Sequence, residues 1–522
     1  METFPFLEAT IVLPLLGALA LLFIPDEEQE ALRGATLASA VLTFLASLPL
    51  FWLYDAGRGG FQLQKSHAWL PGIGASFSLG IDGVSLLLIL LTTFLTPAAV
   101  LCSWRGIGQR VKSFHLALLV MESAMIGVFA ARDLLLFFLF FEVQLVPMFL
   151  LIGVWGGEER VRAALKFFIY TAVGSLLMLG AVAYVYVRAG HTFDLATIEL
   201  KLSALRGAEA GLQFGAREQF WLCAAFAFAF AIKVPIMPLH TWLPHAHVQA
   251  PTAGSVILAA VMLKMGGYGF LRFCLPLFPD GLVHVTPLGF TLAGLLTWLG
   301  VLGVVYGALM ALAQSDLKRL IAYSSVSHLG LVVAGLFAGL TASSLAGGGP
   351  AGPGHARAVA GAVFQMIAHG LSTGALFFLV GCIYDRRHTK LIGKLGGLAR
   401  PAPMLATCFV MATLASVALP GTAGFVGEVL ILIGVYESNR LAAALAATGM
   451  VLGAVYMLWA VQRVFFGPVE GENREVEDLD RVELLGLVPI LAAALLLGVF
   501  PGPCLSLIEP TLTGLTQLYG GV

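Results

Sequence analysis

The chain has 522 residues, of which 59% are apolar and only 11% are charged, and its mean hydropathy is +0.92. A soluble domain carries about 25% charged residues, so this composition indicates a protein surrounded by lipid. The formal net charge of −1 offers no basic surface for nucleic acid, so we expect no nucleic-acid partner.

The first predicted element is an apolar helix near residues 5–24, and it opens a series of fourteen candidate membrane spans. A span needs about 20 mostly apolar residues. Glu2 and Glu8 are the charges of this first stretch, so it lacks the basic region of a signal peptide and is interpreted as a span. The candidates lie near residues 5–24, 31–54, 81–103, 112–131, 134–154, 165–187, 219–240, 254–275, 286–311, 320–341, 357–384, 402–436, 441–462 and 483–502.

Two of these segments contain prolines that interrupt a helix. The stretch FAIKVPIMPLH carries Pro235 and Pro238, and LPGTAGF carries Pro420 within 402–436, a segment too long for one pass. Proline removes a backbone hydrogen bond and frees carbonyls that can hold water. Paired interruptions in the two halves of a chain are typical of inverted-repeat transporters, whose site lies near the membrane midplane.

The connections between spans differ in positive charge. Lysine and arginine are more frequent in the odd-numbered connections than in the even-numbered ones. Because cytoplasmic connections carry the excess of these residues, we expect the odd connections to face the cytoplasm. Both termini would then lie on the non-cytoplasmic side of the membrane.

No sequence motif points to a bound cofactor or metal. No G-x-x-x-x-G-K-[ST] motif occurs, and no cysteine pair has the C-x-x-C spacing. We therefore expect no cofactor, no metal and no disulfide framework in this chain. The six scattered cysteines are Cys102, Cys223, Cys274, Cys382, Cys408 and Cys504.

Four ionisable residues are predicted to lie well inside spans, namely Glu142, Lys233, Lys264 and Glu428. Each would cost about 3 kcal/mol or more at the bilayer centre if it faced lipid, so we expect all four to face the interior of the bundle. Lys233 has the alternative of extending to the membrane surface. A buried ion pair that only fixes packing is a second alternative. The default interpretation of acids and bases within a membrane is a path for protons or ions.

Lysine and histidine are suited to such a path. Burial disfavours the charged form of a lysine and a nearby carboxylate favours it, so a change at the carboxylate can switch the lysine between holding and releasing a proton. His328 and His369 also lie within spans, and histidine exchanges protons near physiological pH. Either histidine alone is as readily explained as a satisfied core residue. Together with the two lysines and the two glutamates, these histidines give six titratable residues that could pass protons along such a path.

Other polar residues near the spans have simpler interpretations. His240, His245 and His247 are expected to be solvated residues of a connection, with a role in proton uptake as the alternative. The segment SDLKRL at 315–320 is interpreted as a helix cap at the cytoplasmic surface, and Asp133 as a helix N-cap.

Several of these stretches resemble a known family. KVPIMPLHTWLPHAHVQAPTAGSVILAAVMLKMGGYGFLRF (233–273) is similar to the signature of the antiporter-like membrane subunits of respiratory complex I. FFEVQLVPMFLLIGVWG, DLKRLIAYSSVSHLG and LPGTAGFVGE resemble the matching segments, and the likeness covers most of the chain. The position of Glu428 distinguishes branches of that family, since its counterpart in subunits L and N and in sodium/proton antiporter relatives is typically lysine.

The resemblance implies an all-α polytopic membrane protein of about fourteen helices with two inverted five-helix repeats, each with a discontinuous helix. The parts would be 1–111 (N-terminal helices), 112–275 (first repeat), 276–463 (second repeat) and 464–522 (cytoplasmic loop, last span and C-terminal tail). By the same resemblance, Glu142 and Lys233 form a coupling pair, Lys264 is the central relay, His328 and His369 continue the path, and Glu428 is its terminal site.

The implied function is proton translocation in the membrane arm of an NADH–quinone oxidoreductase in a bacterial inner membrane. Redox chemistry would occur in other subunits, and the partners would be subunits L and N and the lipid bilayer. The alternatives are a subunit of a multisubunit sodium/proton antiporter, of a membrane-bound hydrogenase or of a photosynthetic complex of related type. A proton-inert spacer and a small-solute carrier are further alternatives, although no polar cluster suited to a solute is evident.

Overall fold

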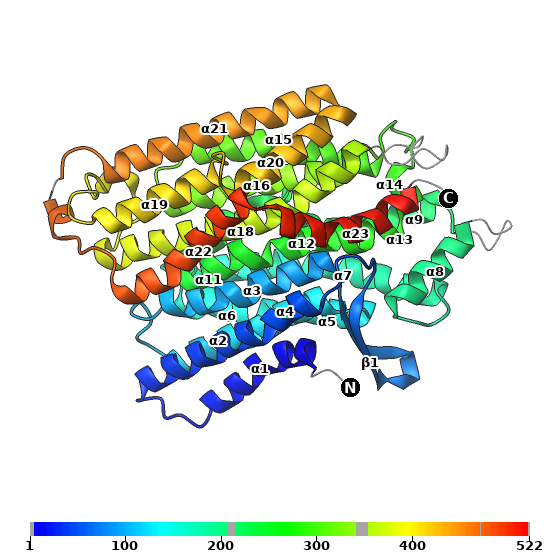
Figure 1. Ribbon diagram of the computed structural model, residues 1–522, viewed down its shortest axis with the longest axis horizontal. Helices are drawn as coiled ribbons and strands as arrows, with labels where there is room; N and C mark the ends of the chain where they lie inside the picture. The colour runs from blue at the N-terminus through cyan, green and yellow to red at the C-terminus, as the bar shows by residue number, and fades with distance from the viewer. Residues whose placement is uncertain (1–4, 207–213, 341–352, 470, 520–522) are drawn as a thin grey trace.

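The computed structural model describes residues 5–206, 214–340, 353–469 and 471–519. These residues form an elongated bundle whose helices run roughly side by side along its long axis (Figure 1). Within them, eleven helices are long and apolar enough to cross a membrane. The predicted polytopic helical fold is therefore confirmed, whereas the total of fourteen spans stays a prediction.

The N-terminal region contains four helices and a small sheet. The helices are α1 (Phe6–Leu21), α2 (Gln29–Leu53), α3 (Gly83–Cys102) and α4 (Val111–Ala130). Between α2 and α3, strands β1 (Gln62–Leu70) and β2 (Ala75–Ile81) pair in antiparallel fashion. The prediction of an all-α chain is wrong for this connection. The alternating polar and apolar residues of ASFSLGI have the period of two that suits a strand.

The span predicted near 134–154 consists of two helices, α5 (Leu134–Val143) and α6 (Leu145–Trp155), which meet at Gln144. Asp133 accepts hydrogen bonds from the backbone N–H groups of Leu135 and Leu136, which confirms its predicted N-cap role. The next two helices are α7 (Arg160–Arg188) and α8 (Leu195–Arg206).

The first proline-broken segment is interrupted where the sequence predicts it. Helix α9 (Ala216–Lys233) ends at the lysine, and the chain resumes as η2 (Leu239–Thr241) and α10 (Trp242–Gln249). The following span contains two π-helical stretches, which are frequent at functional sites. Its elements are α11 (Thr252–Ile257), η3 (Leu258–Met262), α12 (Lys264–Gly269), η4 (Phe270–Cys274) and α13 (Leu275–Leu277), followed by α14 (Pro279–Val283).

The second half repeats the pattern of long helices with one interruption. It contains α15 (Leu292–Leu312), α16 (Leu317–Phe337), α18 (Pro353–Arg387), η5 (Ile392–Lys394), α19 (Pro403–Ser416), α20 (Ala423–Ser438) and α21 (Arg440–Phe465). Pro420 lies in the gap between α19 and α20, beside Gly421 with a φ of +93°, so the predicted break is present.

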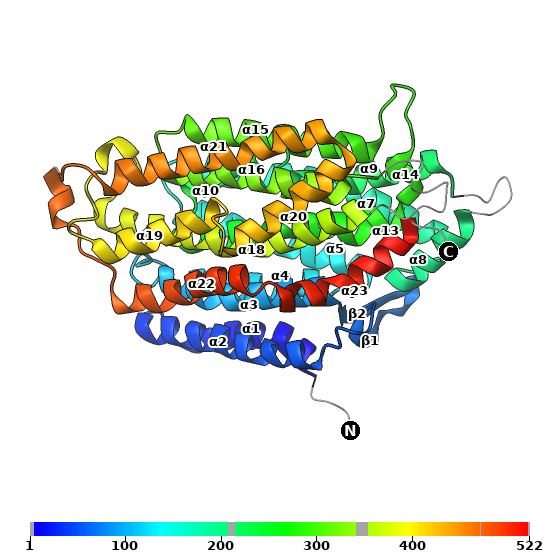
Figure 2. The ribbon, with the colours of Figure 1, turned by 45° about the horizontal axis from the view of Figure 1, so that its top comes forward.

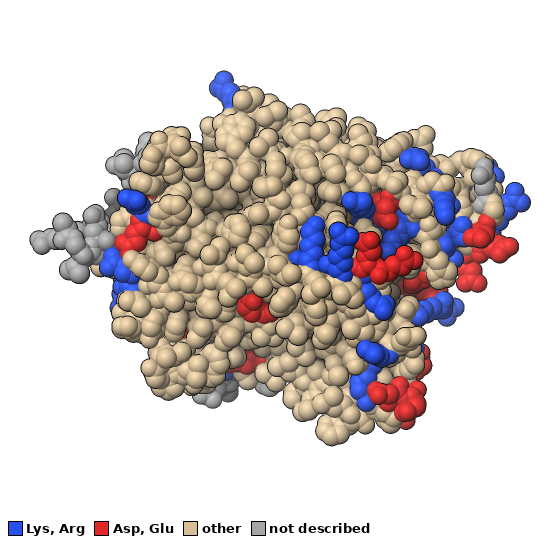
Figure 3. Space-filling view, turned by 180° about the vertical axis from the view of Figure 1, so that it is seen from behind, with Lys and Arg blue, Asp and Glu red and all other residues tan. Residues whose placement is uncertain are grey.

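The C-terminal region contains η6 (Gly471–Glu475), α22 (Arg481–Val499) and α23 (Gly502–Tyr519). The residues predicted as a C-terminal tail thus form a helix, which packs on α3 and α18. Both chain ends lie at the same end of the bundle as the β-hairpin (Figure 1). In Figure 3, charged residues gather mainly toward the two ends of a largely uncharged face.

The interior of the bundle consists of the segment Thr252–Leu277 and the long helix α18. The most apolar window of each is fully buried, whereas α2, α21 and α22 bury a third or less of theirs, as expected of helices that face lipid. Figure 2 shows α18 between a layer that holds α15 and α21 and a layer that holds α1 and α2. The two interior helices are the ones that carry Lys264 and His369.

Candidate functional site

The interruption after α9 leaves Lys233 inside the protein. Its side chain is 1% exposed, and its Nζ atom has no hydrogen-bond partner among the described residues. The Nζ atom lies 5.0 Å from the ring centroid of Phe141 and 6.0 Å from that of Phe167, a distance at which a cation is attracted to an aromatic face. The alternative in which Lys233 extends to the membrane surface does not match this burial.

Glu142 lies close to this lysine. It follows Phe141 at the end of α5, is half-buried, and interacts with the Ser175 hydroxyl and with the charge of Lys233. Its Oε1 atom has no hydrogen-bond partner among the described residues. The structure therefore brings the predicted pair near each other without a direct bond, and leaves a buried carboxylate oxygen without a partner among the described residues.

Lys264 and His369 form a direct contact in the centre of the bundle. Lys264 Nζ lies 2.7 Å from His369 Nδ1 and donates to the carbonyl of Ala259 at 2.5 Å. A charged lysine has only donors, so His369 Nδ1 accepts from it and the ring proton then resides on Nε2. That Nε2 atom is buried without a partner among the described residues. Ala259 belongs to the π-helical stretch η3.

The contact continues from His369 toward α20. The rings of His369 and His328 lie 5.6 Å apart between centroids, and His328 Nδ1 lies 2.9 Å from Glu428 Oε1. Gln365 Nε2 donates to the same oxygen at 3.1 Å. Four of the six predicted residues, contributed by four helices, thus follow one another in an unbroken series of contacts from Lys264 to Glu428.

The Glu142–Lys233 pair and this series are adjacent. A Cβ atom on Gly266 would lie 2.7 Å from the carbonyl oxygen of Phe230 and 3.0 Å from the backbone nitrogen of Val234. Helix α12, which begins with Lys264, therefore packs closely against the backbone at the end of α9. The absence of a side chain at Gly266 is what permits this approach.

Two histidines predicted to be solvated lie inside the protein. His240 and His247 are both buried, and His247 lies on α10, which packs between α7 and α16. The ring of His247 stacks on Phe377 at 4.4 Å, and neither of its nitrogens has a hydrogen-bond partner in the described chain. The prediction of a solvated connection is therefore wrong here, although His245 is only half-buried.

The segment 315–320 is only in part the predicted surface cap. Asp316 caps α16 by accepting from the backbone of Arg319. Lys318, however, is buried and donates to the carbonyl of Ala250 at 2.6 Å. The sequence shows a lysine at a helix end, where extension to the surface is common, so no local signal distinguished it from a solvated residue.

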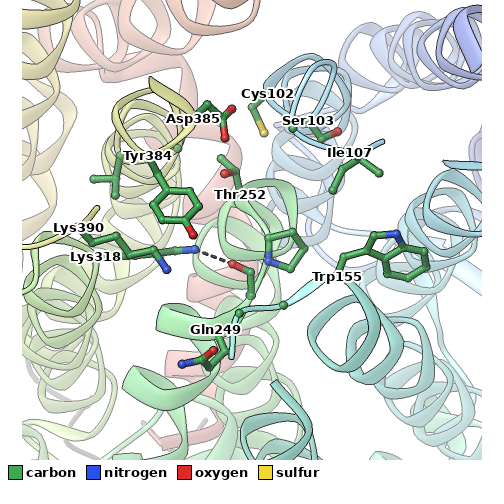
Figure 4. Close-up of a pocket in the computed structure, with 17 residues that line it drawn as sticks. Cys102, Ser103, Ile107, Trp155, Gln249, Thr252, Lys318, Tyr384, Asp385 and Lys390 are labelled. Carbon is green, nitrogen blue, oxygen red and sulfur yellow. Dashed lines mark hydrogen bonds between the residues drawn. The ribbon is translucent and has the colours of Figure 1, made fainter. Parts of the chain in front are cut away.

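A cavity of about 140 Å³ opens beside Lys318, and Figure 4 shows Lys318, Asp385, Lys390 and Ser103 among its lining residues. Lys390 Nζ donates to the carbonyl of Val248 at 2.7 Å. Burial lowers the pKa of Lys390, and the charge of Asp316 opposes this effect by raising it. The cavity thus adjoins the end of α10, on which His247 lies.

The prediction of four charges within spans is also incomplete. Glu122 lies in the middle of α4, inside the span predicted near 112–131, and is fully buried. His115 on the same helix is buried as well. Their signal in the sequence was of the same kind as that of Glu142, a titratable residue within an apolar run.

Comparisons with known proteins place the chain in a known family. Residues 131–453 match the family described as NADH:quinone oxidoreductase/Mrp antiporter, TM. The chain is 45% identical over 503 residues to NADH-quinone oxidoreductase subunit M of Rhodobacter capsulatus, with 95% of this chain and 92% of that protein covered. It is 40% identical to NADH-ubiquinone oxidoreductase chain 4 of Marchantia polymorpha, with coverages of 98% and 97%.

Solved structures give the same result. A chain of respiratory complex I from Thermus thermophilus matches with a TM-score of 0.83 and 35% identity, over 99% of this chain and all of that one. A chain of the Mrp complex from Dietzia matches with a TM-score of 0.78 at 23% identity, over 97% of this chain and 52% of that one, which shows the shared fold alone.

The fold and the buried series of titratable residues define a multi-pass membrane protein of the antiporter-like class. The chain belongs to the NADH:quinone oxidoreductase/Mrp antiporter family, as an antiporter-like membrane-arm subunit of respiratory complex I. Its relatives are subunits of larger membrane complexes, so its partners are other membrane subunits.

Proposed function

We propose that this chain translocates protons along the series Lys264, His369, His328 and Glu428, with Glu142 and Lys233 as the pair that couples it to the rest of the complex. The observation that carries the proposal is the continuity of contacts from Lys264 to Glu428 across four helices. A proton can move along such a series when water completes the hydrogen bonds at buried atoms that lack a partner, such as His369 Nε2.

The coupling step is electrostatic. An ionised Glu142 stabilises the charged form of Lys233, whose burial otherwise disfavours it. When a neighbouring subunit neutralises or displaces the Glu142 charge, Lys233 releases its proton toward Lys264, across the close approach of α9 and α12. The energy that arrives from redox chemistry elsewhere must exceed about 2.3 kcal/mol per 100 mV for each proton moved across the membrane.

Protons are taken up through the cavity beside Lys318. His247 lies between this end of the protein and the central series, and it interacts electrostatically with both Lys318 and Lys264. His247 is also close enough to His369 to influence it. This arrangement supports the uptake role that was the alternative interpretation of the histidines near α10.

The finer architecture belongs to the same proposal. We propose fourteen spans with inverted repeats at 112–275 and 276–463, flanked by 1–111 and 464–522. The interruptions of α9/α10 and α19/α20, one in each repeat, support this arrangement. The chain would lie in a bacterial inner membrane between subunits L and N, with both termini on the non-cytoplasmic side and no cofactor of its own.

A sodium/proton antiporter, membrane-bound hydrogenase or photosynthetic complex would use a related subunit, and the likeness to the Mrp complex supports the shared fold. Glu428 favours the complex I function, because its carboxyl group contacts His328 at the position where those relatives typically carry a lysine. The relatives at 40–45% identity are named as oxidoreductase subunits.

The test is a Glu142→Gln substitution in the assembled complex, with quinone reduction and proton uptake measured separately in membrane vesicles. The change removes the charge that faces Lys233 and keeps the shape of the side chain. We expect quinone reduction to persist while proton transfer through this subunit slows about 100-fold or more, which lowers the number of protons per electron. Glu158→Gln, which alters an exposed carboxylate of the next connection, is the matched control. An unchanged proton-to-electron ratio in Glu142→Gln would contradict the proposal.

A further inference from the structure

A second set of buried polar groups lies between α3 and α4, apart from the central series. On α4, Glu122 and His115 are both 0% exposed. Neither carboxylate oxygen of Glu122 and neither ring nitrogen of His115 has a hydrogen-bond partner among the described residues. The two residues are seven positions apart and therefore lie on the same face of the helix.

Helix α3 presents hydroxyl groups to this face. Thr96 lies beside the Glu122 carboxyl without completing a hydrogen bond to it. Its own hydroxyl donates to the carbonyl of Thr92 at 2.9 Å, and the Thr92 hydroxyl donates to the carbonyl of Leu88 at 2.7 Å. Because both hydroxyl protons are used within α3, the oxygens can only accept. In this arrangement they are placed to receive a hydrogen bond from a protonated carboxyl or from water.

The set reaches toward both ends of the bundle. Ser103, which follows the C-terminal end of α3, lines the cavity shown in Figure 4. At the opposite end of α3, the Ser85 and Tyr268 hydroxyls lie 3.0 Å apart, and Tyr268 donates to the carbonyl of Phe129 on α4 at 3.1 Å. Phe129 is seven residues beyond Glu122, on the same face of α4.

At the end of α3 near Ser85, these hydroxyl groups continue to an ion pair. Arg272 Nε donates to the Tyr268 hydroxyl at 3.2 Å, and the guanidinium pairs with Asp82. Arg272 belongs to the π-helical stretch η4 and is largely buried. The polar groups thus extend from the cavity to a buried ion pair at the other end of α3.

Few charged groups face this set from the helices around it. The positive charge of Arg33 on α2 interacts electrostatically with His115. Three other elements packed on α4 carry a charged residue. Glu8 of α1 pairs with Lys65 at 2.9 Å. The other two residues are Glu142 of α5 and Lys264 of α12. No cation is recorded against Glu122 in the described chain, so no ion pair accounts for its burial.

Packing does not explain these residues either. A buried polar group without a partner costs about 1–3 kcal/mol, and an uncompensated charge costs more. Glu122 and His115 both carry this cost and make no hydrogen bond in return. The burial of such groups is explained if water enters beside them and exchanges protons with them.

We propose that Glu122 is a proton-binding site near the middle of the membrane. It belongs to a second row of water-linked polar groups, which lies between α3 and α4. His115 is the next proton-binding group of this row in the direction of the cavity. The step is a proton transfer alone, from water or His115 to the carboxylate and back, so it needs no other reactant. The inference rests on the proposed proton translocation and adds a branch that shares none of its six central residues.

The experiment is infrared difference spectroscopy on the assembled complex in lipid, recorded before and during turnover with NADH and quinone. We expect a change in the C=O stretch of a protonated carboxyl that is absent from Glu122→Gln and retained, with a shift, in Glu122→Asp. Proton uptake per electron should fall in Glu122→Gln and recover in part in Glu122→Asp. Ser123→Ala, whose hydroxyl donates to Ile11 of α1 instead, is the matched control.

Thr96→Val keeps the shape of its side chain and serves as a second variant if Glu122→Gln fails to assemble. It should shift the same band because it removes the oxygen beside the carboxyl. A band and a proton-to-electron ratio that are unchanged in Glu122→Gln, or in Thr96→Val if only that variant assembles, overturn the inference. If Glu142→Gln lowers the proton-to-electron ratio in the same assay, the proposed path from Lys264 to Glu428 stands and only the second row at Glu122 is refuted. If neither variant lowers it, both proposals fail.

Discussion

At the scale of single residues, a defining property of this protein is that the buried residues from Lys264 to Glu428 contact one another between helices, whereas Lys233 and Glu122 have no hydrogen-bond partner among the described residues. Lys264 binds His369, and His328 binds Glu428, through contacts between positions 105 and 100 residues apart in the chain. An unpaired charge at this depth would cost several kcal/mol, so these contacts are needed for the side chains to remain charged or hydrogen-bonded inside the bundle.

A Lys264→Ala substitution tests the central relay. Because the variant removes the amine that contacts His369 Nδ1, the series is cut between α12 and α18. We expect proton transfer through this subunit to fall about 100-fold or more, while quinone reduction in the assembled complex continues. Proton uptake and quinone reduction in vesicles are the measurements. If the ratio of protons to electrons stays at the wild-type value in a fully assembled complex, the chain is a proton-inert spacer.

At the scale of elements, interruptions and glycines determine where the charged side chains meet. The break after α9 ends a helix at Lys233, and the π-helical stretch before Lys264 presents the Ala259 carbonyl to its amine. Gly427, beside Glu428, has the same role as Gly266, since a Cβ atom there would lie 2.8 Å from the backbone Cα atom of Gln365. Small residues let these helices approach closely, which side chains at the same positions would prevent.

A Gly266→Val substitution tests this close approach. The added side chain would collide with the backbone of Phe230 and Val234, which cannot move as the end of a flexible side chain can. We expect a loss of about 1–3 kcal/mol of stability, seen as a lower unfolding temperature of the purified complex or as poor assembly.

The matched control is Gly180→Ala on α7, where a Cβ atom meets no other atom within 4 Å. Alanine is favoured over glycine within a helix by about 0.5–1 kcal/mol, so this variant should be as stable as the wild type or slightly more so. Equal stability of both variants would show that Gly266 does not control the packing of α12 on α9.

At the scale of the whole molecule, the two ends of the bundle carry different structures. The β-hairpin and both chain ends lie at one end, and the connection from α21 to α22 lies at the other (Figure 1). The connections rich in lysine and arginine are at the second end, and this charge bias predicts that the second end faces the cytoplasm.

Single-cysteine labelling tests this orientation. Glu472→Cys lies on η6, and Gly72→Cys lies in the exposed turn between β1 and β2. A membrane-impermeant thiol reagent should label position 472 only when the cytoplasmic face is accessible, and position 72 only from the other side. The six native cysteines are buried and should react little, so the unmodified protein is the background control. The reverse labelling pattern would invert the assigned orientation.

Much of this architecture could be predicted from local sequence. The spans, the two interruptions and the depth of the six central residues depend on hydropathy and on proline, which act within a few turns of the chain. The β-hairpin was missed because its alternation is short. Glu122 was missed although it is a titratable residue within an apolar run, which is the same signal as that of Glu142.

The amino-acid sequence by itself therefore determined that the protein lies in a membrane and which titratable residues lie within its apolar segments, because the cost of placing each residue in hydrocarbon is a property of that residue. The tertiary structure alone decided that Lys264 meets His369, that His247 and Lys318 are inside, and that α3 and α4 enclose Glu122. Those outcomes depend on which helices pack together, and the energy of such contacts is shared between positions far apart in the chain.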